Sequence, residues 1–240
     1  MRTIHYKQLI CSGESFKAAA KAMRELTYEA RMERGFVVED DAPSFIRGKY
    51  YYTKMNTVKS IDRVTLKPIE EKSESLCEVL FTLDLRLGLV SVEGRRNGLS
   101  ALYEALDALP DVGVEFQDLH LNLKDYVFEL QHAFNKNEIR VIKVKDYLAR
   151  ENALASPSFK LVDVREGEKL VEKWSDQAVA VKLDFKLPSG KVSFGVQKRG
   201  TLSFTDDTPT ELMDYAREQL PRFHEAEVET AEIRGLTTAR

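Results

Sequence analysis

The sequence contains few of the motifs that build metal sites and nucleotide sites. Its two cysteines form no CxxC pair and it has only four histidines, which excludes a zinc ribbon or an iron–sulfur site held by one chain. The twelve glycines are scattered, and neither GxxxxGKS/T nor GxGxxG occurs. A GxSxG nucleophile elbow is absent as well. We therefore expect no nucleotide hydrolysis of the usual kind and no cofactor.

Long apolar runs are also missing. No segment approaches the roughly 20 apolar residues of a membrane helix, and the first residues lack the apolar block of a signal peptide. What is present is the composition of a folded protein, because the 240 residues are 43% hydrophobic and 31% charged, with a net charge of -3. Cys11 and Cys77 are expected to be reduced thiols. These features predict a cytoplasmic protein without a membrane span.

The first part of the chain has a strand-like pattern followed by a helix-like one. Residues 3–11 are β-branched and aromatic, which predicts a strand. An apolar stripe over 15–34 predicts a helix, with Ser12 as its N-cap. Residues 39–43 are expected to form an acidic linker.

Two hairpins are expected next. Residues 45–68 are rich in tyrosine and β-branched residues, which predicts a hairpin with its turn at Met55 and Asn56. Residues 76–94 contain two apolar runs around a short turn, which predicts a second hairpin. Leucines at spacings of three and four after Asn97 then predict a helix that ends before Pro110.

The second half contains further strands and helices. Asn122 is expected to cap a short helix, and residues 138–148 predict a strand that is buried on one side through Ile139, Val141 and Val144. A meander of three strands is expected over 178–206.

The last helix has a complete start signal. Thr208 is the expected N-cap, Pro209 the first helical residue, and Glu211 closes a capping box.

Short turns join most neighbouring strands, so we expect an α+β fold, mainly antiparallel sheets and hairpins with helices packed on one face. The composition shifts near 152–158. This shift divides the chain into an N-terminal unit over 1–152, with a basic tyrosine-rich hairpin, and a C-terminal strand-helix-meander-helix unit over 153–240. One continuous domain is the alternative.

Candidate metal ligands are few. His120 and His132 lie near Asp118 and Asp125 in the sequence, but ordinary surface or partly buried histidines are the favoured interpretation. We therefore expect no metal site.

Positive charge is concentrated in two segments. The segment from Phe45 to Lys67 contains six basic residues and one acidic residue, a balance of 6 - 1 = +5, and three tyrosines are interleaved with the basic residues. From Lys182 to Arg199 the balance is 5 - 1 = +4, whereas the region after Asp206 is strongly acidic. Cations neutralise phosphates and tyrosines stack on bases, so these segments suit nucleic acid. The alternative to nucleic-acid binding is that these lysines protect exposed edge strands from aggregation.

The order of elements resembles a known family. The succession VLFTLDLRLGLVSVEG, a helix ending at Leu109–Pro110, DLHLNLKDYVFEL and AVAVKLDFKLPSGKVSFGVQKRGTLSF resembles the central and C-terminal parts of RdgC, a recombination-associated DNA-binding protein. RGKYYYTKMNTVKSIDR is similar to part of the RexA phage-exclusion proteins, whose architecture looks related. The resemblance covers about residues 45–205 and rests on element order and hydrophobic pattern.

The resemblance implies a non-catalytic protein that binds duplex DNA with little sequence preference, as a dimer that closes around it. This chain departs from RdgC because it lacks a long lysine-rich helical segment. The family's basic patch before the third helix corresponds here to residues 160–165, where only Lys160 and Arg165 could make its contacts.

The favoured hypothesis is a sequence-independent DNA-binding protein in recombination control or in phage exclusion and defence, acting as a homodimer. The residues expected to contact DNA are Arg47, Lys49, Tyr51, Lys54, Lys59, Arg63, Lys182, Lys198 and Arg199. The alternative is a protein–protein interaction or toxin-control module without nucleic-acid binding. In that case the acidic C-terminal helix or the tyrosine-rich hairpin docks a protein partner.

Overall fold

The computed structural model describes residues 1–61, 68–134, 137–145, 147–150, 153–161, 166–187 and 190–225. Within it the chain forms two compact units. The first unit comprises Met1–Asp118 and Thr201–Asp207, and the second comprises Leu119–Gly200 and Thr208–Arg240. These units differ from the segments 1–152 and 153–240 expected from composition. The reason is long-range pairing, because the strand over residues 137–144 joins the sheet of the second unit.

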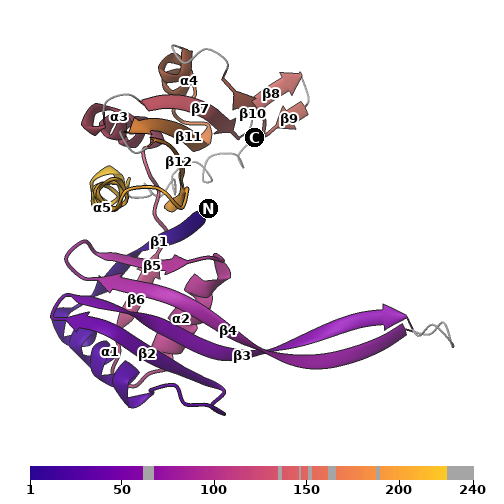
Figure 1. Cartoon of the computed structure of the whole chain (residues 1–240), viewed down its shortest axis with the longest axis vertical. Helices are drawn as coiled ribbons and strands as arrows, with labels where there is room; N and C mark the ends of the chain where they lie inside the picture. The colour runs from indigo at the N-terminus through magenta and orange to yellow at the C-terminus, as the bar shows by residue number, and fades with distance from the viewer. Residues whose placement is uncertain are drawn as a thin grey trace, which may run out of the picture. The chain divides into compact units, whose positions relative to one another are not determined.

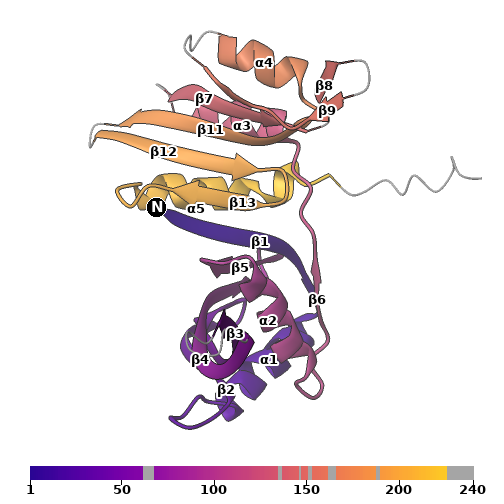
Figure 2. The ribbon, with the colours of Figure 1, turned by 90° about the vertical axis from the view of Figure 1, so that its right-hand side faces the viewer.

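The first unit is an antiparallel sheet with two helices. Its elements are β1 (Arg2–Cys11), α1 (Gly13–Glu25), β2 (Arg34–Ala42), β3 (Phe45–Ile61), β4 (Pro68–Asp84), β5 (Leu89–Glu93), α2 (Asn97–Asp107), β6 (Val114–Gln117) and β13 (Thr201–Phe204) (Figure 1). The strand order is β13-β1-β5-β4-β3-β2, and β6 also pairs with β1. Helices α1 and α2 lie together on one side of these strands (Figure 2), where Phe16, Met23, Leu102 and Leu106 are buried.

The second unit has a smaller antiparallel sheet, in the order β10-β7-β11-β12. Its elements are α3 (Leu123–Ala133), β7 (Asn137–Val144), β8 (Tyr147–Arg150), β9 (Ala153–Ala155), β10 (Ser158–Lys160), α4 (Gly167–Lys173), β11 (Ala178–Leu187), β12 (Gly190–Gln197), α5 (Thr210–Gln219) and a 3-10 turn (Pro221–Phe223). Strands β8 and β9 pair only with each other in the described ranges.

The helices of the second unit cover one face of its sheet. The Phe134 ring after α3 meets Phe185 of β11 edge-on, with ring centroids 6.1 Å apart. Trp174 at the end of α4 stacks on Phe159 of β10 at 4.5 Å. Helix α5 packs on α3, where the hydroxyl of Tyr126 donates to the carbonyl oxygen of Ala216 over 2.8 Å. The opposite face of this sheet carries no described helix.

Both units therefore confirm the α+β fold, with antiparallel sheets and helices on one face. Several local predictions are confirmed as well. Ser12 caps α1 through a 3.0 Å hydrogen bond from the backbone N–H of Ser15, and Asn122 caps α3 through one of 3.1 Å from Asp125. Helix α5 starts one residue later than expected, with Pro209 at the N-cap position. Among the described helices, none has the length and apolar character needed to cross a membrane.

The expected helix over 15–34 is too long. Helix α1 ends at Glu25, and β2 occupies most of the expected acidic linker. The chain folds back on itself here, because the N–H of Phe36 donates to the carbonyl of Leu26 and the N–H of Tyr28 donates to the carbonyl of Phe36. Pairing with β3 thus overrides both the helical periodicity and the acidic composition.

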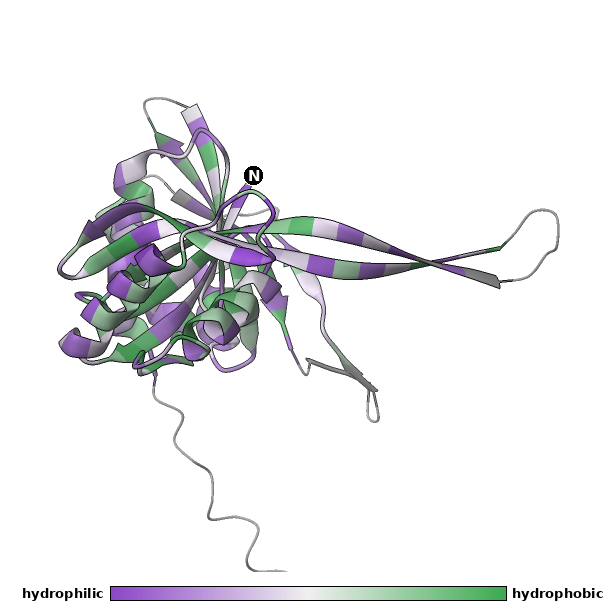
Figure 3. Cartoon of the chain, turned by 90° about the horizontal axis from the view of Figure 1, so that it is seen from below, coloured by the Kyte–Doolittle hydropathy of each residue, from purple (hydrophilic) through white to green (hydrophobic). Residues whose placement is uncertain are grey.

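The expected turn at Met55 and Asn56 is also wrong. Strand β3 continues through these residues and pairs with β4 from Phe45, opposite Asp84, to Ile61. The pairing of β2 with β3 stops at residue 52, and that of β5 with β4 stops at residue 80. Residues 53–61 and 68–76 therefore form a two-stranded ribbon, which we call the arm. Figure 3 shows the arm extending away from the rest of its sheet.

Candidate nucleic-acid interface

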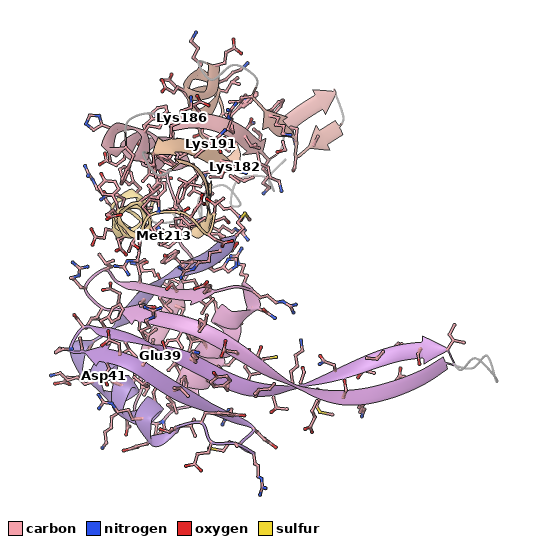
Figure 4. All side chains as sticks on the ribbon, viewed as in Figure 1. Glu39, Asp41, Lys182, Lys186, Lys191 and Met213 are labelled. Atoms are coloured by element: carbon pink, nitrogen blue, oxygen red, sulfur yellow. The ribbon has the colours of Figure 1, made fainter. Side chains whose placement is uncertain are left out.

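The cations of β3 lie beside acids from the neighbouring strands. The Arg47 guanidinium is 4.0 Å from Glu39 of β2, and the Lys49 ammonium is 3.6 Å from Glu39 and 3.8 Å from Glu78 of β4. Glu39 is labelled in Figure 4. The balance of +5 counted along this segment is thus offset by acids of adjacent strands. A continuous positive surface therefore does not form around Arg47 and Lys49.

The arm repeats this pattern of paired charges. Lys59 stands directly opposite Glu70 in the β3–β4 register, and their charged atoms are 3.1 Å apart. Lys54 is exposed and lines a cavity of about 430 Å³ that also includes Glu78 and Arg95. Arg63 lies outside the described residues.

The three consecutive tyrosines do not form an open stacking surface. Tyr50 is buried and Tyr52 stacks on it, with ring centroids 5.6 Å apart. Tyr51 points to the other face, where its ring contacts Tyr28 at 4.8 Å and its hydroxyl donates to Glu78 over 2.6 Å. That hydrogen bond to a carboxylate raises the pKa of Tyr51 to about 12. Tyr51 is therefore held in place by protein contacts on the same face as Arg47 and Lys49.

The uncovered face of the second unit is different. Residues that stand directly opposite each other in adjacent strands share a face. The register places Lys160, Val141, Lys182 and Gly195 in one row, and Lys143 and Ala180 in the next. We call this face, opposite α3 and α4, the open face. Its described charged residues are Arg140, Lys143, Lys160, Lys182, Lys186, Lys191, Glu138 and Asp184.

The two acids of the open face hold three of its cations in place. Asp184 accepts hydrogen bonds from Arg140 and Lys191, and both are 3.0 Å long. Glu138 forms salt bridges with Arg140, at 2.9 Å, and with Lys186. Burial of Asp184 would raise its pKa, but hydrogen bonds from Ser193, Lys191 and Arg140 outweigh burial and hold the pKa below its ordinary value. The hydrogen bond from Lys186 likewise lowers the pKa of Glu138. Both carboxylates thus organise the surrounding cations.

The open face remains positive after these pairs are counted, since six cations against two acids give 6 - 2 = +4. Lys143, Lys160 and Lys182 make no salt bridge within the described part of the chain. Figure 4 labels Lys182, Lys186 and Lys191 on β11 and β12. Strand β11 lies between β7 and β12, so protection of an exposed edge does not account for Lys182.

Three of the residues expected to contact DNA belong to this unit. Lys182 lies on the open face, and Lys198 and Arg199 follow the end of β12, at one end of that face. Sequence reasoning missed Arg140 and Lys143, because it did not reveal that β7 pairs with β11. The expectation for β7 was also wrong in detail, since a register shift near Arg140 leaves Val141 partly exposed among the lysines.

The remaining chemical candidates do not form a cluster. In the described ranges, no three histidine, cysteine, aspartate or glutamate side chains lie close enough together to hold a metal ion. His132 is exposed on α3, whereas His120 lies in the second unit beside the end of β12. Both cysteines are free thiols, and burial raises the pKa of Cys11.

No protein-family model matches the chain, and no curated protein matches its sequence.

Proposed function

We propose that the chain binds nucleic acid without sequence preference and without catalysis, with duplex DNA as the favoured ligand, through the open face of the second unit. The observation that supports this most is the placement of six cations on four adjacent strands around two acids that already have partners. Lys143, Lys160 and Lys182 are available to phosphates, because forming such contacts breaks no salt bridge in the described structure.

The composition of the open face favours contacts to the phosphate backbone. Besides its charged residues, the described rows of this face contain serine, glycine, glutamine, valine and alanine, and none of them is aromatic. Without a stacking surface or a protruding helix it offers little to read base edges, so binding is independent of sequence. Strand spacing makes the face about 14 Å across and about 20 Å long, enough for several phosphates of one duplex.

The cations of the first unit contribute less in this proposal. Arg47, Lys49 and Lys59 would each have to exchange a nearby carboxylate for a phosphate, which reduces the gain from binding. The resemblance to RdgC and RexA suggests recombination control or phage exclusion as the biological setting.

A charge-matched pair of variants tests the proposal. The first variant replaces Lys143, Lys160 and Lys182 by glutamine on the open face. The control replaces Lys17, Lys21 and Lys169, three exposed lysines on helices, by glutamine and therefore has the same net charge. Fluorescence anisotropy with a 20-base-pair duplex is measured at several salt concentrations. Each lost phosphate contact lowers the salt slope by about 0.9, so we expect a decrease of about 2.7 for the open-face variant and little change for the control.

Equal slopes and equal affinities for the two variants would show that binding follows net charge alone and would contradict the proposed interface. Failure of the wild-type protein to retard duplex DNA at low salt would contradict the function itself. Far-ultraviolet circular dichroism establishes that both variants are folded.

A second candidate function, self-association through the arm, is favoured by a separate observation. Met55, Val58, Ile61 and Leu76 are all more than half exposed, with relative exposures of 55%, 52%, 68% and 55%. The arm, residues 53–61 and 68–76, carries three lysines and three glutamates, a balance of 3 - 3 = 0, so its described residues carry no net charge that would attract a polyanion. A neutral surface with alternating charges is complementary to a second copy of itself, and no other strand in the described part of the chain pairs with either long edge of the arm.

Light scattering after size exclusion tests this candidate. We expect the wild-type protein to dimerise with increasing concentration and the variant Met55→Ser, Val58→Ser, Leu76→Ser to remain monomeric. Ile10→Ser removes an exposed apolar side chain outside the arm and should leave the dimer intact. A wild-type protein that is monomeric at every concentration would exclude this role for the arm.

A further inference from the structure

A cavity at one end of the open face has the chemistry of an anion site. Its volume is about 450 Å³, within the range of small-ligand pockets. The residues that line it are His120, Lys143, Lys145, Asp176, Gln177, Val179, Ala180, Gln197, Lys198 and Arg199. All of them belong to the second unit.

The hollow follows from the register of the sheet. Ala180 of β11 stands between Lys143 of β7 and Gln197 of β12 in one row of the open face. The methyl group of Ala180 is much shorter than the side chains on either side of it, so a depression forms above this residue. The small side chain thus allows the lysine and the glutamine to line a shared space.

The walls of the cavity are fixed by backbone hydrogen bonds. The N–H of Lys145 donates to the carbonyl of Gln177 over 2.8 Å, and the N–H of Lys198 donates to that of Val179 over 2.9 Å. The turn that carries Arg199 is closed by a 3.0 Å bond between the backbones of Gly200 and Gln197. The cationic side chains are therefore mounted on ordered backbone, which lowers the entropy cost of gathering them around one ligand.

The lining is strongly positive. Lys143, Lys145, Lys198 and Arg199 against Asp176 give a formal balance of 4 - 1 = +3. Lys143, Lys198 and Arg199 make no salt bridge in the described ranges. Ammonium, guanidinium and amide groups are hydrogen-bond donors suited to phosphate oxygens. Among the described residues that line the cavity, the His120 ring is the one aromatic group, so these residues offer little surface on which a base would stack.

We propose that this cavity binds a terminal phosphate group, either at the end of a nucleic acid or on a free mononucleotide. This inference rests in part on the proposed function, because Lys143 belongs to both the open face and the cavity. A phosphate at a strand end carries more negative charge than an internal one and is less hindered, so it can enter a cavity that a continuous backbone can only cross.

The experiment compares three DNA probes at 0.1 M salt. These are a 20-base-pair duplex with 5′-phosphates, the same duplex with 5′-hydroxyls, and a closed circle without ends. One additional phosphate contact corresponds to about eightfold tighter binding at this salt concentration, which is the preference we expect for the phosphorylated ends. Calorimetry with AMP and with adenosine tests the free nucleotide, and we expect only AMP to bind.

Three variants locate the effect. Ala180→Leu fills the cavity without changing charge and should abolish the preference for 5′-phosphate ends over 5′-hydroxyl ends. Arg199→Gln, in an exposed turn, should reduce the preference and provides a second test if Ala180→Leu does not fold. Lys182→Gln is the control on the open face outside the cavity, and should weaken binding of all three DNA probes while retaining the preference.

The outcomes separate this inference from the proposed function. Binding of AMP without binding of any DNA supports the cavity and contradicts the proposed function. Binding of AMP and of DNA with no preference for phosphorylated ends assigns the cavity to free mononucleotides. Equal binding of all DNA probes together with no binding of AMP overturns the inference and leaves the proposed function standing.

Discussion

Substitution of Asp184 should lower the stability of the protein and raise its affinity for duplex DNA. It is only 6% exposed, and its carboxylate accepts hydrogen bonds from Arg140, Lys191 and Ser193. The substitution Asp184→Asn removes the negative charge but keeps the size of the side chain. It leaves Arg140 and Lys191 close together with one acid fewer between them.

The magnitudes follow from these contacts. A hydrogen bond to a charged group contributes about 1.5–3 kcal/mol, and the asparagine retains part of the network, so we expect the free energy of unfolding to fall by about 2–3 kcal/mol. Affinity for duplex DNA should rise by about eightfold at 0.1 M salt, since one more cation is available to a phosphate. Because its pKa is depressed in the folded state, Asp184 stabilises the wild type above its ordinary pKa of 3.8. This contribution is lost as the pH falls through the lower folded pKa, and the variant lacks it.

Urea unfolding measures the first quantity, and fluorescence anisotropy with a labelled duplex measures the second. Asp206→Asn is the matched control, since it adds the same charge at an exposed position of the first unit, where Asp206 pairs with the terminal amine. We expect it to change neither quantity appreciably. An Asp184→Asn protein that is folded but binds DNA more weakly than wild type would refute the reasoning, because added positive charge on the interface must favour a polyanion.

Two further predictions concern the first unit. The hydroxyl of Tyr51 donates to Glu78 only while it is protonated, so its contribution to stability is complete below pH 10 and is lost as the pH rises to about 12. In the Tyr51→Phe variant the melting temperature should therefore fall less steeply with pH over this interval than in the wild type. An unchanged pH profile of the melting temperature would contradict the assignment. Gly35→Ala places a Cβ 2.6 Å from the Cα of Tyr28 and should lower the free energy of unfolding by about 1–3 kcal/mol, whereas Gly13→Ala meets no atom within 4 Å and should be neutral in the same urea titration.

Several elements of the fold could be predicted from local sequence patterns. The caps at Ser12 and Asn122 and the β-branched and aromatic composition of β1 each involve residues close in sequence, and the structure confirms both caps and the strand. The length of β3 could not be predicted in the same way. An isolated ribbon such as the arm has no third strand, and the polar residues near Met55 are typical of a turn as much as of a strand with two exposed faces.

The charge of the surface depended on pairings between distant strands. Counting along the sequence made the segment around Lys49 the most basic part of the chain, but folding brings Glu39 and Glu78 beside it. The same effect worked in the other direction in the second unit, where β7 adds Arg140 and Lys143 to the lysines of β11. A charge balance read along one strand therefore says little until the neighbouring strands are known.

The most direct test of the central claim locates the contact on the protein. Lysine acetylation is followed by mass spectrometry with and without saturating duplex DNA, so that each lysine reports its own protection. We predict protection of Lys143, Lys160 and Lys182, with Lys17 and Lys169 acetylated equally in both states. Protection confined to Lys49, Lys54 and Lys59 of the first unit, with the open-face lysines fully reactive, would contradict the account.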